Sequence, residues 1–330
     1  MTKSRAIVFT SPHQVGLQEL EIPKPGHREL LVKTLYTGIS TGTETRVLCG
    51  NQTGAHFPLI PGYENIGRIV ETGESAAFKS GDIVFHTGSI FTGRFTKCWG
   101  AHLEYALVNE TEVYSVPEGL DPEDGVYAKV GAIALHGVKR AQISEHDTVV
   151  IVGLGLIGHL AAQCAKAFRA RVIGVDTNPE RLKLAAAAGI EYLVDASQEN
   201  VKLKVDEYAD KNVSVVMDVT GIADAIKNTA SLVRSMPWNP PYPASPKLVI
   251  LGSYTDPIVL DYDPLFRDEV DMLFSRDTRP DDINDMLNLI KEKKVNPRVL
   301  NAKCFNVDDA PQAYKELVEK KLMRVIFKWE

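Results

Sequence analysis

Residues 148–158 read TVVIVGLGLIG, and this stretch decides the fold. The run TVVIV is rich in β-branched residues, as is typical of a buried strand. Glycines then follow in the pattern GxGxxG at Gly153, Gly155 and Gly158, and the residues after them have helical spacing. A strand, a glycine-rich turn and a helix in this order predict the first βαβ unit of a dinucleotide-binding fold.

The glycines of this motif have separate physical roles. Gly153 permits the tight turn after the strand, Gly155 lets a pyrophosphate approach the backbone, and Gly158 lets the helix pack closely on the strand. Free N–H groups and the positive end of the helix dipole then attract the pyrophosphate. We therefore expect a cofactor-binding loop that consists of Gly153, Leu154, Gly155, Leu156, Ile157 and Gly158.

An acidic residue follows the glycine motif at the distance that a dinucleotide site requires. Asp176 lies 18 residues after Gly158, at the end of the next predicted strand. Its carboxylate can accept hydrogen bonds from the adenosine ribose and would repel a 2′-phosphate, so NAD is favoured over NADP. We assign Thr177 and Arg181 to the same site. The alternative is a structural glycine turn in an unrelated α/β domain.

From residue 148 onward, the chain alternates between strand-like and helix-like segments. Such alternation is typical of an α/β fold with a doubly wound parallel sheet, the Rossmann fold. We expect strands at 148–152, 171–175, 191–195, 213–218 and 247–251, and helices at 157–169, 179–188, 200–210 and 222–233.

The segments on either side of this region predict a different domain. Roughly the first 125 residues contain short β-type runs separated by turn signals, which is typical of a small barrel or sandwich. The tail has predicted helices at 280–293 and 310–319 and a last strand at 324–328. The predicted organisation is a β-rich domain over 1–130, a nucleotide-binding domain over 131–275, and a return of 276–330 to the first domain.

The composition excludes several classes of protein. The chain has 330 residues and a net charge of −6, so it lacks the basic character of a nucleic-acid-binding protein. No apolar run is long enough to span a membrane, and the N-terminus shows no signal-peptide core. The cysteines never form a CxxC pair. We therefore expect a reduced, cytoplasmic protein without nucleic-acid or membrane partners.

Several segments outside the glycine motif resemble one family. They are PKPGHRELLVK at 23–33, TGISTGTE at 37–44, PGYENIG at 61–67, GDIV at 81–84, AHLEY at 101–105 and DVTG at 218–221. Together they make the chain similar, over nearly its whole length, to the medium-chain dehydrogenases/reductases. The resemblance implies a GroES-like β-rich catalytic domain, a Rossmann coenzyme domain and an active site between them. It also implies a homodimer formed by edge strands of the Rossmann sheets, here near residues 258–262.

The positions that bind zinc in this family are changed in the chain. Zinc-dependent members carry Gly-Ile-Cys and Gly-His-Glu where this chain has GIS at 38–40 and GYE at 62–64. A third ligand is expected near Ala128 and Lys129, and the region of the structural-zinc lobe retains only Cys98. Zinc needs three or four N, S or O ligands, so we expect no metal site. The changed motifs are most similar to those of the bacteriochlorophyllide dehydrogenase group, which oxidises a secondary alcohol with NAD.

Without zinc, a side chain or a water must handle the proton and the charge on the substrate oxygen. Tyr63 occupies the former His-ligand position, and a phenol can act as acid or base if a cation lowers its pKa. Lys129 is the candidate for that cation or for a group that holds the substrate oxygen. Ser40 and Thr43 are candidate proton relays, and Glu64 is a candidate orienting group. Alternatively, Tyr63 only fills the space left by the metal, and Lys129 is an exposed lysine at a helix start.

The resemblance assigns further cofactor contacts. Thr220 follows the fourth predicted strand, near the ribose. Gly252 and Ser253 follow the fifth, where backbone groups of the family hold the carboxamide. Arg324 begins the last strand, where some members place an arginine on the pyrophosphate, and a guanidinium suits a bidentate phosphate contact. The alternative for Arg324 is a surface position.

The sequence thus predicts a zinc-independent, NAD(H)-dependent oxidoreductase that transfers hydride between nicotinamide and a small secondary alcohol or ketone. Two alternatives stay open. A quinone or enone reductase acting on a C=C bond would prefer NADPH, and a catalytically silent nucleotide-binding protein would bind NADH without turnover.

Overall fold

The computed structural model describes residues 1–239 and 244–329, which form two compact units. Unit 1 consists of Met1–Val130, Ile283–Lys291 and the segment from Asn301 onward. Unit 2 consists of Gly131–Asp282 and Glu292–Leu300. Two parts of the predicted returning tail, residues 276–282 and 292–300, thus lie in unit 2. The second part lies there because the short 3-10 helix η2 (Pro297–Leu300) packs on helices of that unit.

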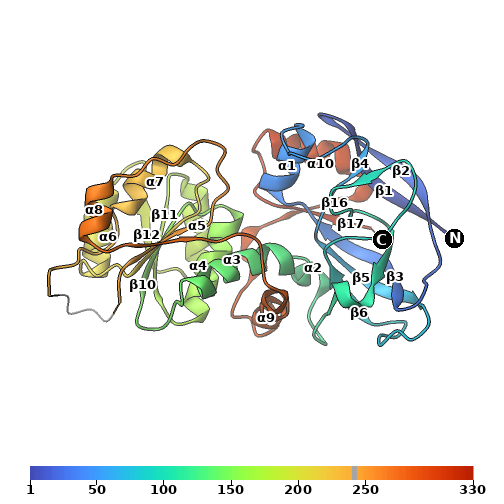
Figure 1. The fold of residues 1–330 in the computed structure, drawn as a ribbon, viewed down its shortest axis with the longest axis horizontal. Helices are drawn as coiled ribbons and strands as arrows, with labels where there is room; N and C mark the ends of the chain where they lie inside the picture. The colour runs from blue at the N-terminus through green and yellow to red at the C-terminus, as the bar shows by residue number, and fades with distance from the viewer. Residues whose placement is uncertain (240–243, 330) are drawn as a thin grey trace. The chain divides into compact units, whose positions relative to one another are not determined.

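Unit 2 is built around a parallel sheet with the strand order β12-β11-β10-β13-β14-β15 (Figure 1). This is the strand order of a doubly wound Rossmann fold, as predicted. The strands are β10 (Thr148–Val152), β11 (Arg171–Asp176), β12 (Tyr192–Asp195), β13 (Val215–Asp218), β14 (Lys247–Ile250) and β15 (Asp271–Phe274). The helices are α4 (Leu156–Ala167), α5 (Pro179–Ala187), α6 (Val201–Ala209), α7 (Ala223–Ala230) and α8 (Tyr262–Arg267).

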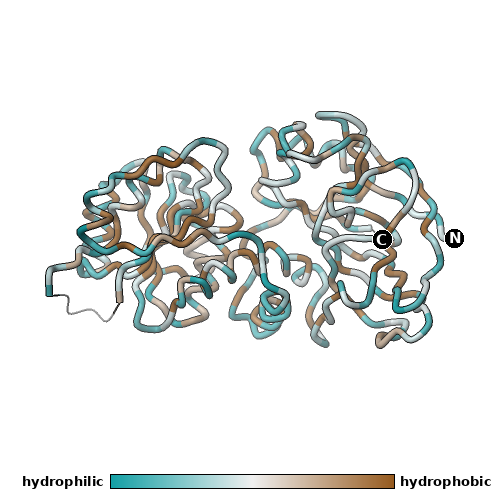
Figure 2. Tube along the Cα trace, viewed as in Figure 1, coloured by the Kyte–Doolittle hydropathy of each residue, from teal (hydrophilic) through white to brown (hydrophobic). Residues whose placement is uncertain are grey.

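The central strands of unit 2 are apolar over most of their length because helices cover both faces of the sheet. On one face, Val150 and Val216 pack with Val205 of α6 and Ile226 of α7 in one buried cluster. Figure 2 shows how strongly apolar residues concentrate in these strands. The burial of this cluster holds the carboxyl ends of the strands in place, where a Rossmann fold binds its ligand.

Polar caps decide where two of the helices begin. The Asn178 side chain accepts a hydrogen bond from the Glu180 N–H at the start of α5. The Asn200 side chain accepts one from the Leu203 N–H at the start of α6. A cap of this kind stabilises a helix by about 1 kcal/mol. Helix α5 therefore starts soon after β11, which ends at the predicted site residue Asp176, and α6 follows β12.

Strand β15 lies at an edge of the sheet. It pairs with β14 in parallel register, with Leu273 opposite Val249. The prediction that residues 258–262 form the edge is wrong, because the chain there leads into helix α8, whose N-cap is Asp261. Phe274, at the end of the true edge strand, is 60% exposed.

Unit 1 is rich in antiparallel strands, which confirms the predicted GroES-like β-rich domain. Its sheets have the orders β2-β1-β4-β7 and β16-β17-β3-β5-β6-β9, and β8 pairs with β3. The strands are β1 (Thr2–Ser11), β2 (Gln14–Ile22), β3 (Glu29–Gly38), β4 (Leu59–Ile60), β5 (Asn65–Thr72), β6 (Ile83–His86), β7 (Thr96–Lys97), β8 (Tyr105–Asn109), β9 (Val113–Ser115), β16 (Lys303–Asn306) and β17 (Val325–Lys328).

The remaining helices lie in unit 1 or contain a boundary between the units. They are α1 (Thr41–Leu48), α2 (Pro122–Gly125), α3 (Ala128–Arg140), α9 (Pro280–Lys291) and α10 (Ala310–Val318), with 3-10 turns η1 (Glu110–Glu112) and η3 (Val307–Asp309). Helix α1 is absent from the sequence prediction. Within the described residues, none of the helices combines the length and the apolar character needed to cross a membrane.

The C-terminal segment completes unit 1. Strand β17 pairs antiparallel with β3, with Ile326 opposite Gly38, and parallel with β16. Phe327 of β17, Tyr314 of α10 and Phe9 of β1 belong to one buried cluster. The core of unit 1 is therefore made from both ends of the sequence.

We expect unit 1 to lose stability in mild acid because of His86. Its ring is fully buried, and Nδ1 lies 2.8 Å from the Gly88 carbonyl oxygen. Burial lowers the pKa of His86 from 6.5 to about 4. Between these pH values the unfolded chain binds a proton at His86 that the folded chain does not bind. The stability that comes from a neutral His86 is therefore fully present above the unfolded pKa and is lost as the pH falls. A shift of this size corresponds to about 3 kcal/mol.

The measurement is urea unfolding of the wild type and of His86→Asn at a series of pH values between 4.5 and 6.5. The wild-type free energy of unfolding should fall more steeply with decreasing pH, by about 1 kcal/mol per unit. His146→Asn, at an exposed histidine, is the control. Equal slopes for the wild type and His86→Asn would contradict the assignment.

Candidate functional site

The glycine loop of unit 2 has the geometry of a pyrophosphate-binding turn. Gly153 has a φ of +92°, which side chains rarely allow. A Cβ on Gly158 would lie 1.9 Å from the Gly153 carbonyl oxygen, so only glycine allows helix α4 to approach the strand end. A Cβ on Gly155 would meet nothing within 4 Å, so the backbone there faces open space. The free N–H groups at the start of α4 are thus accessible to an anion.

Asp176 lies at the end of β11 and is fixed between the glycine loop and helix α5. One carboxylate oxygen accepts the Leu154 N–H at 2.7 Å, and the other accepts the Asn178 N–H at 2.8 Å. Arg181 approaches the first oxygen at 3.4 Å. Among the described residues, the oxygen that accepts the Asn178 N–H has no second partner of this kind, so the carboxylate can still accept a hydrogen bond from a ligand hydroxyl.

A cavity of about 730 Å³ opens beside these groups, within the usual size of a small-molecule site. Predicted residues that line it are Gly153, Gly155, Asp176, Thr177, Arg181 and Thr220. Predicted residues outside its lining are Leu154, Leu156, Ile157, Gly158, Gly252 and Ser253. The cavity also borders α6 and α7 through Val201, Ala225 and Asn228, which the sequence did not indicate.

Two further polar residues meet at the carboxyl ends of β13 and β14. Asp218 is fully buried and accepts hydrogen bonds from the Thr220 N–H at 3.0 Å and the Thr220 hydroxyl at 2.7 Å. The Tyr254 hydroxyl donates to the same carboxylate. A Cβ on Gly252 would lie 2.6 Å from the Tyr254 hydroxyl, so the phenol covers this predicted cofactor contact. The DVTG motif contains Asp218, but no pattern indicated Tyr254.

In unit 1, the structure brings Ser40, Thr43 and Tyr63 together. Ser40 is the N-cap of α1, yet its side chain makes no hydrogen bond to the helix. Its hydroxyl instead accepts a hydrogen bond from the Tyr63 phenol, which also hydrogen-bonds to Thr43. The Tyr63 side chain is buried, and the Trp99 ring packs edge-on against it at 5.2 Å between ring centres.

The phenol of Tyr63 stays neutral in this environment. Burial, followed by the negative charge of Glu64, raises its pKa well above the usual value of 10. The structure therefore does not support the expected lowering of this pKa by a cation. Lys129, the candidate for that cation, is partly exposed in the first turn of α3. A neutral phenol can donate a hydrogen bond or a proton, and it is a poor base.

Glu64 takes part in a buried ion pair. Its Oε2 lies 2.7 Å from Nη1 of Arg324, and both side chains are fully buried. Its Oε1 accepts the Val130 N–H at 3.0 Å. Arg324 also donates to the Ile39 carbonyl oxygen at 2.6 Å and lies over the ring of Tyr127. The expected role of Glu64 as an orienting group agrees with these contacts.

The position of Arg324 does not fit the role that the resemblance implied. A pyrophosphate contact needs accessible N–H groups, whereas this guanidinium is enclosed in unit 1 and paired with Glu64. The alternative of a surface arginine is excluded by the same burial. We therefore remove Arg324 from the cofactor contacts and place it among the residues that support the Tyr63 cluster.

Another buried carboxylate fixes the backbone of Ser40. Glu44 Oε1 accepts the Ser40 N–H at 2.8 Å. Its Oε2 accepts hydrogen bonds from His102 Nε2 at 2.9 Å and from the Tyr314 hydroxyl at 2.6 Å. This network connects the start of α1 to α10. The TGTE motif contains Glu44, but its partners lie too far away in the sequence to be inferred.

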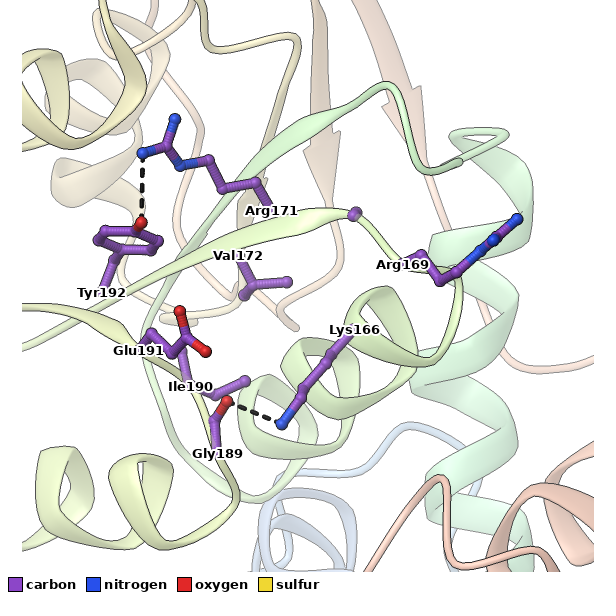
Figure 3. A pocket seen from close by; sticks show the side chains of 9 residues that line it. Lys166, Arg169, Arg171, Val172, Gly189, Ile190, Glu191 and Tyr192 are labelled. Carbon is purple, nitrogen blue, oxygen red and sulfur yellow. Dashed lines mark hydrogen bonds between the residues drawn. The ribbon is translucent and has the colours of Figure 1, made fainter.

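A smaller hollow of about 350 Å³ lies at the amino ends of β11 and β12 (Figure 3). Lys166, Arg169 and Arg171 border it, but Figure 3 shows their charged ends pointing in different directions. Lys166 donates to the Gly189 carbonyl oxygen at 2.8 Å, and Arg171 approaches the Tyr192 hydroxyl at 3.3 Å. Because these cations do not converge on a common point, we assign no ligand to this hollow.

Comparison with known proteins defines the class. Residues 26–118 match the alcohol dehydrogenase GroES-like domain, and residues 157–292 match the zinc-binding dehydrogenase domain. An uncharacterized zinc-type alcohol dehydrogenase-like protein of Escherichia coli K12 is 31% identical over 67% of this chain and 72% of its own length. The chain therefore belongs to the zinc-type alcohol dehydrogenase-like family of medium-chain dehydrogenases/reductases. It is an alcohol dehydrogenase-like oxidoreductase, which confirms the resemblance.

Other relatives match over nearly their whole length. A sorbitol dehydrogenase of Halalkalibacterium halodurans is 27% identical over 98% of both chains. A 2-desacetyl-2-hydroxyethyl bacteriochlorophyllide A dehydrogenase of Rhodobacter capsulatus is 25% identical over 99% of both.

Solved structures share the fold. A zinc-binding dehydrogenase from Sinorhizobium meliloti 1021, bound to NADP, has a TM-score of 0.85 at 24% identity over the full length of both chains. A short chain alcohol dehydrogenase from Escherichia coli CFT073, complexed with NADH, has a TM-score of 0.85 at 20% identity over the full length of both.

The residues at the zinc-ligand positions of the family do not suit zinc. Ser40 and Tyr63 are hydrogen-bonded to each other, and the raised pKa of the phenol disfavours the anionic form that a metal would bind. The Glu64 carboxylate is already paired with the Arg324 guanidinium. Across residues 1–239 and 244–329, no three His, Cys, Asp or Glu side chains gather in an arrangement that could hold a metal ion.

Proposed function

We propose that this chain is a zinc-independent, NAD(H)-dependent oxidoreductase acting on a small secondary alcohol or ketone. The single observation that carries the proposal is the Ser40–Thr43–Tyr63 cluster at the family's zinc-ligand positions. Both whole-length relatives carry names of dehydrogenases for hydroxyl-bearing compounds, which supports the substrate class.

The cavity in unit 2 suits a nicotinamide dinucleotide. The open backbone at Gly155 and the free N–H groups of α4 suit the pyrophosphate. Asp176 suits a ribose hydroxyl of NAD and would repel the 2′-phosphate of NADP. When bound, such a cofactor donates or accepts the hydride. Structural neighbours bind NADP in one case and NADH in another, so the proposed preference for NAD rests on Asp176.

The Tyr63 cluster would serve the oxygen of the substrate. The phenol donates to Ser40 Oγ, which leaves the serine hydroxyl hydrogen available to a ligand oxygen. During ketone reduction, this hydrogen bond would stabilise the negative charge that develops on the oxygen and then supply the proton. The Tyr63 phenol would then give its proton to Ser40 Oγ, and solvent would return a proton to the phenol. The raised pKa of Tyr63 makes the cluster a proton source at neutral pH.

The experiment that tests this function combines metal analysis with cofactor titration on one preparation. We expect no stoichiometric zinc, tighter binding of NADH than of NADPH, and turnover of a secondary alcohol or ketone. One zinc per chain would refute zinc independence. A strong preference for NADPH would favour a C=C reductase, and tight NADH binding without any turnover would favour a silent nucleotide-binding protein.

Asp176→Ala is expected to weaken NADH binding about tenfold, because a charge-assisted hydrogen bond to the ribose is lost. NADPH binding should improve relative to NADH, since the repulsion of the 2′-phosphate disappears. Fluorescence titration of both cofactors measures the two affinities. Asp195→Ala, at the end of the neighbouring strand and outside the cavity lining, is the matched control. An unchanged ratio of affinities in Asp176→Ala would contradict the assignment.

We also propose a homodimer that forms at the edge of the unit 2 sheet. Phe274 on β15 and Tyr262 and Phe266 on α8 are 60%, 74% and 61% exposed. An open edge strand with apolar neighbours is a typical association surface. Light scattering that shows only monomer at micromolar concentration would refute the dimer.

A further inference from the structure

We infer that Trp99 is a substrate-contacting residue that gives the Tyr63 cluster a preference for secondary alcohols and ketones with a planar aromatic substituent. This inference rests on the proposed function of the cluster. It names a residue that would select the substrate, which the relatives leave open, since one whole-length relative is named for the polyol sorbitol and another for a hydroxyethyl bacteriochlorophyllide.

Trp99 lies directly beside the phenol that we propose as the proton source. The ring centres of Trp99 and Tyr63 are 5.2 Å apart, and the ring planes meet at 79°. The indole is 39% exposed although it packs against a nearly buried tyrosine. One part of the indole is thus anchored on the phenol, and the rest is accessible to a ligand.

The backbone around Trp99 is held in an unfavourable conformation. Trp99 has a φ of +67° and Gly100 a φ of +76°. Left-handed backbone is uncommon for a bulky aromatic residue and persists only where the surroundings enforce it. The Ser89 hydroxyl donates to the Gly100 carbonyl oxygen, and a Cβ on Gly88 would lie 2.8 Å from the Trp99 carbonyl oxygen. These close contacts fix the turn, and the turn directs the indole to Tyr63.

Apolar side chains near Ser40 favour an apolar ligand over a polyhydroxylated one. Partly buried Cys98, Phe57 and Ala55 pack on the same core cluster as Ile39, next to Ser40. The carboxylates whose charges act on Tyr63, Glu64 and Glu44, are fully buried and bonded to protein partners, so they do not present acceptors for several hydroxyls. A planar ring can stack on the indole, whereas a polyol would leave its hydroxyls without partners there.

The test compares the wild type with Trp99→Ala and Trp99→Phe, using NADH and two ketones of different shape, acetophenone and hydroxyacetone. We expect the wild type to prefer acetophenone in kcat/KM. Trp99→Ala should lower kcat/KM for acetophenone about tenfold or more and for hydroxyacetone less than about threefold, because only the aromatic ligand loses a stacking partner. Trp99→Phe should keep most of the preference. Trp238→Phe, at a 97% exposed indole in unit 2, is the matched control.

Equal losses for both ketones in Trp99→Ala, or a wild-type preference for hydroxyacetone, would overturn the inference. If neither ketone reacts although NADH binds, the proposed function fails, and the role of Trp99 is then decided by binding alone. In that case 1-phenylethanol should change the tryptophan emission of the wild type and of Trp238→Phe but not that of Trp99→Phe. Emission changes that persist in Trp99→Phe would overturn the inference independently of activity.

Discussion

Tyr63→Phe is expected to lower kcat for ketone reduction about a hundredfold, because it removes the hydroxyl that supplies the proton to Ser40. NADH binding should be unchanged, since the cofactor residues belong to unit 2. The pKa of Tyr63 is raised by burial, so the wild-type rate of reduction should show no loss from phenol ionisation as the pH approaches 10. Steady-state kinetics at several pH values, with NADH titration of the same samples, measure both effects.

Thr43→Val is the matched control for this substitution. It removes the weaker partner of the phenol while the bond between Tyr63 and Ser40 stays, so kcat should fall less than in Tyr63→Phe. Ser40→Ala should resemble Tyr63→Phe, because it breaks the same relay. If Tyr63→Phe keeps nearly full kcat, the phenol only fills space, and the proton must come from elsewhere.

Arg324→Met is expected to lower the free energy of unfolding of unit 1 by about 3–5 kcal/mol, because it leaves the Glu64 carboxylate buried without its cation. Burial raises the pKa of Glu64, and Arg324 opposes that rise. Without the arginine, Glu64 should take up a proton at higher pH than in the wild type. The loss of stability should therefore be largest at alkaline pH and smaller in mild acid. Chemical unfolding at pH 5.5 and 8.5 measures the difference.

Two further variants make this second prediction specific. Glu64→Gln combined with Arg324→Met removes both charges and should recover part of the lost stability. Lys303→Met breaks the ion pair between Lys303 and Glu316, which is partly exposed, and should cost much less stability than Arg324→Met. An equal loss for Lys303→Met and Arg324→Met would mean that the burial of the Glu64–Arg324 pair has no energetic consequence.

The nucleotide-binding half of the molecule was predictable because its signals are local. The turn at Gly153, the close packing at Gly158 and the strand end at Asp176 each depend on a few neighbouring residues. The alternation of strands and helices then fixes the order of the sheet by general rules of chain crossover. The walls of the cavity on α6 and α7 could not be predicted, because their positions depend on how the helices pack on the sheet.

The Tyr63 cluster was predictable only in part. The motifs identified Ser40, Thr43 and Tyr63, and the structure brings these residues together. The shift in the pKa of Tyr63 could not be anticipated, since it results from burial and from Glu64 in the folded state. Helix α1 is short and largely polar, so it carries no clear apolar periodicity. Arg324 finds its partner Glu64 far away in the sequence, and no local pattern indicates such a pair.

The pairing of β17 with β3 determines which unit can fold first during synthesis. A ribosome releases the N-terminal residues first. Strand β3 and Ser40 therefore leave the ribosome before Val325–Lys328 has been made, and all of unit 2 is synthesised in between. The nucleotide-binding unit can fold during this interval, as domains generally do during synthesis. A polypeptide that stops before Arg324 would lack β17, and Glu64 would be left without its cation. An unfinished chain could therefore capture a dinucleotide long before it could use one.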